Sequence, residues 1–135
     1  MKNYSKFPLS LLLFLTLGIH AEVVRDWVPL QEEKTITSTY LDINSIVYFQ
    51  KEIVQAQYLV NFGGKPPNNI KNRKSAISTL EIDCNKKTKY RVMNIQWYEQ
   101  NFAKGKFNEE KIINTVWYLP PFEASPKLVI KSLCQ

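Results

Sequence analysis

The chain has 135 residues, of which 44% are hydrophobic and 22% are charged, and its formal net charge at pH 7 is +6. This length predicts one domain with a modest core. The positive charge suits weak attraction to acidic surfaces, glycans or acidic proteins, and it is too small to indicate nucleic-acid binding.

The N-terminus has the parts of a secretion signal: a positive start, an apolar run and a small residue before the cleavage point. These parts are Lys2 and Lys6, residues 11–19, and Ala21. We therefore expect a signal peptide over residues 1–21 and an exported domain over residues 22–135. The apolar run is too short for a membrane span, and no cysteine follows the cleavage point to carry a lipid. The expected location is periplasmic, outer-membrane-associated or extracellular.

Three strands are predicted in the first part of the domain. Residues 22–30 suit a peripheral strand, because Pro29 cannot donate to a central ladder. Residues 35–43 and 46–49 are β-branched and aromatic, so we expect two strands joined by a tight turn at Asn44-Ser45.

The clearest strand spans residues 53–62, where apolar and polar side chains alternate. One face is dry and the other is mostly wet, which is typical of an antiparallel sheet covered on one side. The dry set is Val54, Ala56, Tyr58, Val60 and Phe62, and the other set is Gln55, Gln57, Leu59 and Asn61.

Further on, glycines and prolines predict an exposed loop over residues 63–72. A strand over residues 76–83, a polar turn at residues 85–87 and a return to about Asn101 then predict a hairpin. Residues 102–111 are charged and are expected to form a second long loop. Residues 112–119 are expected to form the last strand.

A helix is predicted only at the C-terminus, where Ser125 suits the N-cap and Pro126 suits the first helical position. Its apolar stripe is Val129, Ile130, Leu133 and Cys134. A helix of about nine residues is unstable alone, so it must dock on the dry face of the sheet. The predicted class is α+β, with a single small antiparallel sheet of about six strands and a short C-terminal helix packed on one face.

The chain has two cysteines, Cys84 and Cys134. An even count in an exported protein favours a disulfide over a metal site or a nucleophile. This bond would close a loop of about fifty residues, fasten the helix to the hairpin, and stabilise the domain by about 4 kcal/mol.

The residues available for chemistry argue against an enzyme. The single histidine, His20, leaves with the signal, so the mature domain has no imidazole for acid–base chemistry or metal binding. The acidic pairs Glu32-Glu33 and Glu109-Glu110 are typical of solvated turns. We expect no catalytic residues, no metal and no cofactor, and binding is the function that remains.

Two basic groups are candidates for partner binding. The first lies at the hairpin tip and suits an acidic partner, although lysines at a turn can also simply keep it soluble and block edge pairing. The second precedes the hairpin and would extend the same patch, or is simply solvated. The groups are Lys86, Lys87, Lys89, Tyr90 and Arg91, and Lys71, Arg73 and Lys74.

Two adjacent aromatic pairs, Trp97-Tyr98 and Trp117-Tyr118, lie on predicted strands, so one member of each should enter the core while the other faces out. We expect the two tryptophans in the core. The alternative is an exposed aromatic row that forms a partner site or a dimer interface on the uncovered sheet face.

The order of motifs along the chain resembles the surface-adhesin protein E family of Gram-negative bacteria. The matching pieces cover nearly the whole mature domain. They are Trp27-Val28-Pro29, the run from Tyr40 to Ile46 with Asp42 and Ser45, Asp83-Cys84 before a basic turn, Trp117-Tyr118-Leu119-Pro120-Pro121 followed by Ser125, and Leu133-Cys134.

The resemblance implies a small antiparallel sheet with a C-terminal helix tied to it by a bond between Cys84 and Cys134, often as a homodimer. It also implies adhesion to host extracellular-matrix or serum proteins such as vitronectin and laminin. The alternative function is a periplasmic protein-interaction or inhibitor module with no host role.

Overall fold

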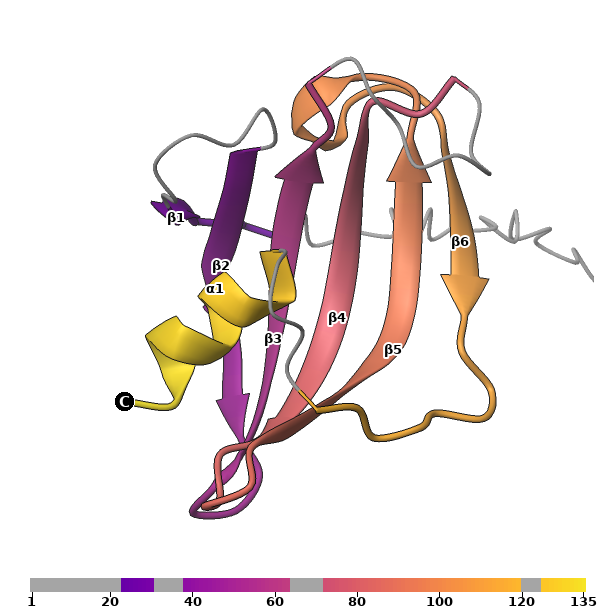
Figure 1. The fold of residues 1–135 in the computed structure, drawn as a ribbon. Helices are drawn as coiled ribbons and strands as arrows, with labels where there is room; N and C mark the ends of the chain where they lie inside the picture. Colours follow the sequence, from indigo (N-terminus) through magenta and orange to yellow (C-terminus); the bar gives the residue numbers. More distant parts are fainter. Residues whose placement is uncertain (1–22, 31–37, 64–71, 120–124) are drawn as a thin grey trace, which may run out of the picture.

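The computed structural model of the protein describes residues 23–30, 38–63, 72–119 and 125–135. Within these residues six strands form one antiparallel sheet in which each strand pairs with the next along the chain (Figure 1). The elements are β1 (Trp27–Leu30), β2 (Ser38–Tyr48), β3 (Ile53–Asn61), β4 (Ser75–Asp83), β5 (Lys89–Tyr98), the 3-10 turn η1 (Asn101–Ala103), β6 (Phe107–Lys111) and helix α1 (Ser125–Leu133).

The predicted sheet and C-terminal helix are confirmed, and β1 lies at the sheet edge as Pro29 requires. The described residues are mostly sheet, with nine residues in the α-helix. The predicted α+β class therefore fits only loosely.

The predicted turn at Asn44-Ser45 is wrong, because β2 runs through these residues as one strand. Asp42 lies opposite Gln57 and Val47 lies opposite Gln55, so residues 43–46 form a bulge against a single residue of β3. The turn-forming residues widen the strand locally without reversing it.

Side-chain hydrogen bonds hold this bulge. The Asp42 Oδ1 atom accepts from the backbone amides of Asp26 at 3.0 Å and Asn44 at 3.1 Å. The Ser45 hydroxyl donates to the Asp42 carbonyl and accepts from the Gln57 amide, both at 2.7 Å. These bonds replace the ladder bonds that the bulge interrupts, which lets the strand continue.

The last strand is also displaced from its predicted position. β6 lies in residues predicted as a charged loop, whereas residues 112–119 contribute a single bridge, between Tyr118 and Tyr90. All five side chains of β6 are exposed, and the strand pairs only with β5. Charged side chains are typical of an edge strand that must not recruit another chain, and they hide the hydrophobic pattern of a strand.

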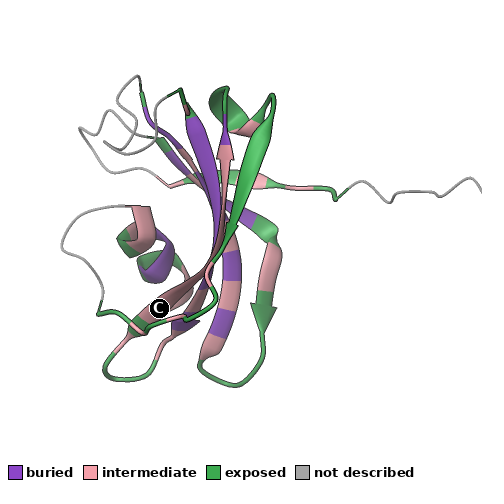
Figure 2. Cartoon of the chain, turned by 90° about the vertical axis from the view of Figure 1, so that its right-hand side faces the viewer, coloured by how far each residue is buried: buried purple, intermediate pink, exposed green. Residues whose placement is uncertain are grey.

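The main core lies between α1 and the sheet face that the sequence predicted to be dry. Figure 2 shows the helix covering this face. Val54, Ala56 and Leu80 are fully buried there under Val129. The predicted docking of the helical stripe is therefore confirmed. The hydroxyls of Thr39 and Ser125 are 2.6 Å apart and join the start of the helix to β2.

A second cluster occupies one end of the opposite face, where Leu59, Ile77 and Tyr98 are buried. The η1 turn lies against this end: the Phe102 amide donates to Asn61 Oδ1 at 2.8 Å. The expectation of one dry and one mostly wet face is therefore wrong at this end of the sheet, because a connection after β5 covers it.

This second cluster also reverses one aromatic prediction. Tyr98 is 6% exposed, whereas Trp97 is half-buried on the helix side of the sheet and stacks on Phe62 at 6.1 Å. Side chains alternate along β5, so once η1 covers the face of Tyr98, its neighbour takes the other face. Trp117 is also half-buried rather than in the core.

Candidate binding surface

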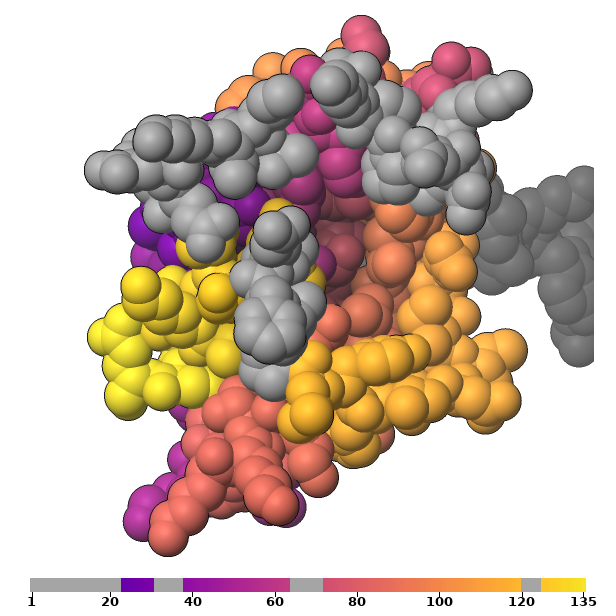
Figure 3. All heavy atoms as spheres, viewed as in Figure 1, coloured from indigo at the N-terminus to yellow at the C-terminus, as the bar shows by residue number. Residues whose placement is uncertain are grey.

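Two turns lie side by side at one end of the sheet. The Phe49 amide donates to the Ile53 carbonyl and closes the β2–β3 turn, and the Cys84 amide donates to the Glu52 carbonyl at 2.8 Å, which joins this turn to the β4–β5 turn. We call residues 48–52 and 84–89 together the two-turn surface. It forms the lower end of the molecule in Figures 1 and 3.

The β4–β5 turn satisfies its own polar groups. Asp83 Oδ1 accepts from the Asn85 amide at 3.1 Å and from the Asn85 side chain at 2.6 Å, and Thr88 donates to the Asn85 carbonyl at 3.3 Å. The local hydrogen bonds fix the backbone and leave the lysine side chains outside this network. Lys86, Lys87 and Lys89 are exposed.

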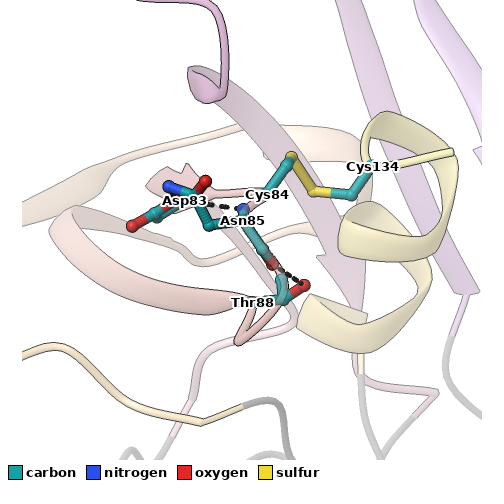
Figure 4. The surroundings of a disulfide bond; sticks show 5 residues. All are labelled: Asp83, Cys84, Asn85, Thr88 and Cys134. Atoms are coloured by element: carbon teal, nitrogen blue, oxygen red, sulfur yellow. Dashed lines mark hydrogen bonds between the residues drawn. A yellow bond between two sulfur atoms is a disulfide. The ribbon is translucent and has the colours of Figure 1, made fainter.

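The Cys84–Cys134 disulfide anchors the base of this turn to the end of α1 (Figure 4). The two Cα atoms are 5.2 Å apart, and the predicted bond is confirmed. Cys84 directly follows β4 and Cys134 directly follows α1, so the bond couples the two-turn surface to the main core.

Arg91 lies on the strand rather than at the tip. Its guanidinium pairs with Glu81 at 2.7 Å, and its Cζ atom lies 4.6 Å from the centre of the Trp117 ring. The side chain is 27% exposed. Because its charge is already paired, the Arg91 side chain is less available for a new ion pair than the lysines of the tip are.

Tyr90 points to the face opposite that of Arg91, packs against the main core and lies 5.9 Å from the ring of Tyr118. Partial burial raises the pKa of Tyr90, and the neighbouring Tyr118 raises it further. Tyr90 therefore belongs to the sheet and its core, although the sequence grouped it with the tip.

The second basic group lies at the far end of β4 from the tip. Arg73 and Lys74 directly precede β4, a strand of nine residues, and Cys84 directly follows it, so the two groups are about 30 Å apart. Arg73 pairs with Glu99 at 3.5 Å, and Lys74 is exposed. Lys71 lies outside the described residues. The expectation that this group extends the patch of the tip is wrong, because the two groups lie at opposite ends of β4.

The β2–β3 turn supplies residues that the sequence interpretation missed. Tyr48 is 61% exposed, Phe49 is 58% exposed, and Lys51 is also exposed. The signal that could have found them is topological: in a sheet of consecutive antiparallel strands, alternate turns lie at the same end. The β2–β3 and β4–β5 turns therefore had to meet, whatever their composition.

Exposed lysines dominate the charge of the two-turn surface. Lys51, Lys86, Lys87 and Lys89 face solvent, and the ion pairs found among the described residues involve none of them. The exposed carboxylate on these turns is that of Glu52, which borders one edge. The surface is suited to recognise an acidic group through charge and an apolar group through Tyr48 and Phe49.

The described residues contain neither a metal-binding cluster nor a membrane-spanning helix. No three metal-ligating side chains among them lie close enough together to hold a metal ion. No helix in this part of the chain is long and apolar enough to cross a membrane.

Comparisons with known proteins identify a family and a shared fold. The description of surface-adhesin protein E matches residues 27–135. No curated protein matches the chain. The structure of Haemophilus influenzae protein E is similar, with 15% identity and a TM-score of 0.57 over 84% of this chain and 86% of that one. The crystal structure of protein E from non-typeable Haemophilus influenzae gives 15% identity and a TM-score of 0.58 over 84% of this chain and 78% of that one.

At this identity the two structures show a shared fold. The family match covers most of the chain, including both cysteines and the bulge of β2. The protein therefore belongs to the surface-adhesin protein E family.

Proposed function

We propose that this protein is an exported, surface-associated binding protein that holds an acidic region of a host matrix or serum protein, such as vitronectin or laminin, on its two-turn surface. Family membership supports the class of function. The observation that carries the choice of site is the set of exposed lysines at two adjoining turns, with a disulfide beneath them. The signal peptide over residues 1–21, which export requires, stays a prediction and lies outside the described residues.

The lysines should mainly increase the rate at which the partner associates with the two-turn surface. Exposed charges steer an oppositely charged partner over distances of about 10 Å at 0.1 M salt, and this attraction falls as salt is added. The turns are held by hydrogen bonds and a disulfide, so little loop ordering opposes binding. Binding through this surface should therefore weaken steeply between 50 and 300 mM NaCl.

The test is binding of the purified protein to immobilised vitronectin and laminin by biolayer interferometry. A variant with Lys86, Lys87 and Lys89 changed to Ala should bind about fivefold to tenfold more weakly at 50 mM NaCl and lose most of its salt dependence. The matched control changes three lysines elsewhere, Lys104, Lys106 and Lys111, which are also exposed. Unchanged binding of the first variant, or equal losses in both, would reject the two-turn surface as the site.

The alternative is a periplasmic interaction or inhibitor module that uses the part of the second sheet face beyond η1. Polar side chains there bond to one another, as Gln57 does to Thr79 at 3.3 Å and Arg91 to Glu81. Side chains that already bond to one another are less available to a partner than the exposed lysines of the two turns are. Protease treatment of intact cells separates the two functions, because a periplasmic protein would be protected from cleavage.

The predicted homodimer is kept as part of this proposal. Its test is size-exclusion chromatography with light scattering, run on the wild-type protein and on the variant of the three tip lysines. A dimer that survives these substitutions would place its interface outside the two-turn surface.

A further inference from the structure

A pocket of about 360 Å³ opens beside the two-turn surface, where the end of α1 meets the β2–β3 turn. Tyr48, Leu133 and the disulfide supply the apolar part of its lining, and Lys51, Glu52 and Gln135 supply a polar part of similar extent. A volume of this size is at the lower end of the range for binding pockets and suits one large side chain. The lining residues are Tyr48, Lys51, Glu52, Cys84, Leu133, Cys134 and Gln135.

The pocket is built on ordered parts of the fold. The Cys84 amide bonds to the Glu52 carbonyl, and the Cys134 amide donates to the Ile130 carbonyl at 2.9 Å. The disulfide links the two backbones, and Leu133 packs against the main core. A preformed pocket of this kind needs little ordering when it is filled, which favours binding.

The negative end of a helix dipole and a group of lysines lie on different sides of the pocket. The C-terminal end of α1 borders it and carries the negative end of the helix dipole, so the interior disfavours an anion. Lys51 and Glu52 are lining residues of opposite charge, and Lys86 and Lys87 lie exposed on the adjoining turn and add to the positive side. The arrangement therefore favours an uncharged apolar group inside and carboxylates outside, on the turns.

From these observations we infer that the two-turn surface binds an acidic protein segment that carries a large apolar side chain. This side chain enters the pocket beside the disulfide, and the neighbouring carboxylates contact Lys51, Lys86 and Lys87. The inference rests on the proposed function and specifies the chemistry of the partner at the same site.

The test uses two synthetic five-residue peptides and amide NMR of the full exported domain at 50 mM NaCl. Both peptides have two acidic residues on each side of a central residue, which is phenylalanine in one and serine in the other. The phenylalanine peptide should bind about tenfold more tightly, as expected for burial of one aromatic side chain. Its chemical-shift changes should centre on Glu52, Cys84, Leu133 and Gln135.

Tyr48→Ser removes one wall of the pocket from an exposed position and should abolish the preference for phenylalanine. The matched control is Phe107→Ser, which removes another half-exposed aromatic from the edge strand β6 and should leave the preference intact. Equal affinities for the two peptides, or shifts centred on the opposite end of the sheet near Lys74, would overturn the inference.

Anionic phospholipid vesicles test the competing occupant of the two-turn surface, which is a membrane. Binding to vesicles of phosphatidylglycerol that depends on the tip lysines, without discrimination between the peptides, would identify a membrane surface instead and would overturn the inference. Lysine-dependent binding to vitronectin or laminin with no peptide discrimination would leave the proposed function standing and reject only the pocket. Peptide discrimination without any binding of either host protein would reject the proposed function alone.

Discussion

Asp42 should be the polar residue whose loss damages the fold most. It is 2% exposed and lies where β2 widens into its bulge. One carboxylate oxygen accepts two backbone amides, from Asp26 before β1 and from Asn44 inside the bulge. Replacing Asp42 with Ala leaves both amides without this acceptor and removes the side-chain link that joins the start of β1 to β2, so that β1 is held by its backbone ladder.

The expected cost follows from these two bonds. A hydrogen bond to a charged group contributes about 1.5 to 3 kcal/mol, and two bonds to one oxygen do not add fully. We therefore expect Asp42→Ala to lower the free energy of unfolding by about 3 kcal/mol, which corresponds to a loss of about 12 °C in Tm for a domain of this size. Asp42→Asn keeps an acceptor oxygen and should cost about 1 kcal/mol.

The assay is urea unfolding followed by tryptophan fluorescence, with the disulfide intact in every variant. Ser45→Ala serves as a neighbouring probe: its hydroxyl bridges the Asp42 carbonyl and the Gln57 amide, so its loss should cost about 1 to 2 kcal/mol. Combining it with Asp42→Ala should give less than the sum of the two losses, because both act on one bulge. A cost under about 1 kcal/mol for Asp42→Ala, or an equal cost for Asp42→Asn and Asp42→Ala, would refute the role of this carboxylate in holding the bulge.

Three further predictions concern the core and its covalent link. Changing Cys84 and Cys134 to Ala should cost about 4 kcal/mol, because the bond closes a separation of 50 residues, and the wild type unfolded in urea with reductant should match this variant. Burial raises the pKa of Tyr58 from 10.0 to about 12. The stability that the neutral Tyr58 side chain contributes is therefore complete below pH 10 and falls by about 3 kcal/mol as the pH rises to 12. Urea unfolding should show this loss in the wild type and should not show it in Tyr58→Phe. Val129→Ala, at a fully buried position of α1, should cost about 2 kcal/mol by thermal unfolding, whereas the exposed Ser132→Ala should change stability by under about 0.5 kcal/mol.

Two predictions that rested on residues close together in the sequence were confirmed. The alternation along β3 identified Val54, Ala56 and Tyr58 as one buried face. The stripe that contains Val129 identified the docked side of α1. In both cases the period of the apolar residues matches the period of the backbone, so a short stretch of sequence contains the whole signal.

Predictions failed where contacts with residues distant in the sequence, and not the local residue pattern, set the backbone conformation. Asn44 and Ser45 are turn-forming residues, yet Asp42 and the facing strand hold them in a bulge. The residues of β6 have no apolar pattern, and their strand conformation comes from pairing with β5. A ladder of backbone bonds can order an edge strand whatever its exposed side chains are.

The same distinction between local and distant contacts applies to the candidate site. The sequence by itself determined that the chain has one histidine, His20, predicted that its two cysteines pair, and placed lysines in the turn of the hairpin. Only the tertiary structure decided that Arg91 is paired with Glu81, that the basic group containing Lys74 lies at the far end of the sheet, and that Tyr48 joins the lysines beside a pocket. Composition and covalent pairing are properties of residues, whereas the neighbours of a side chain depend on strand order and register, which the whole chain sets together.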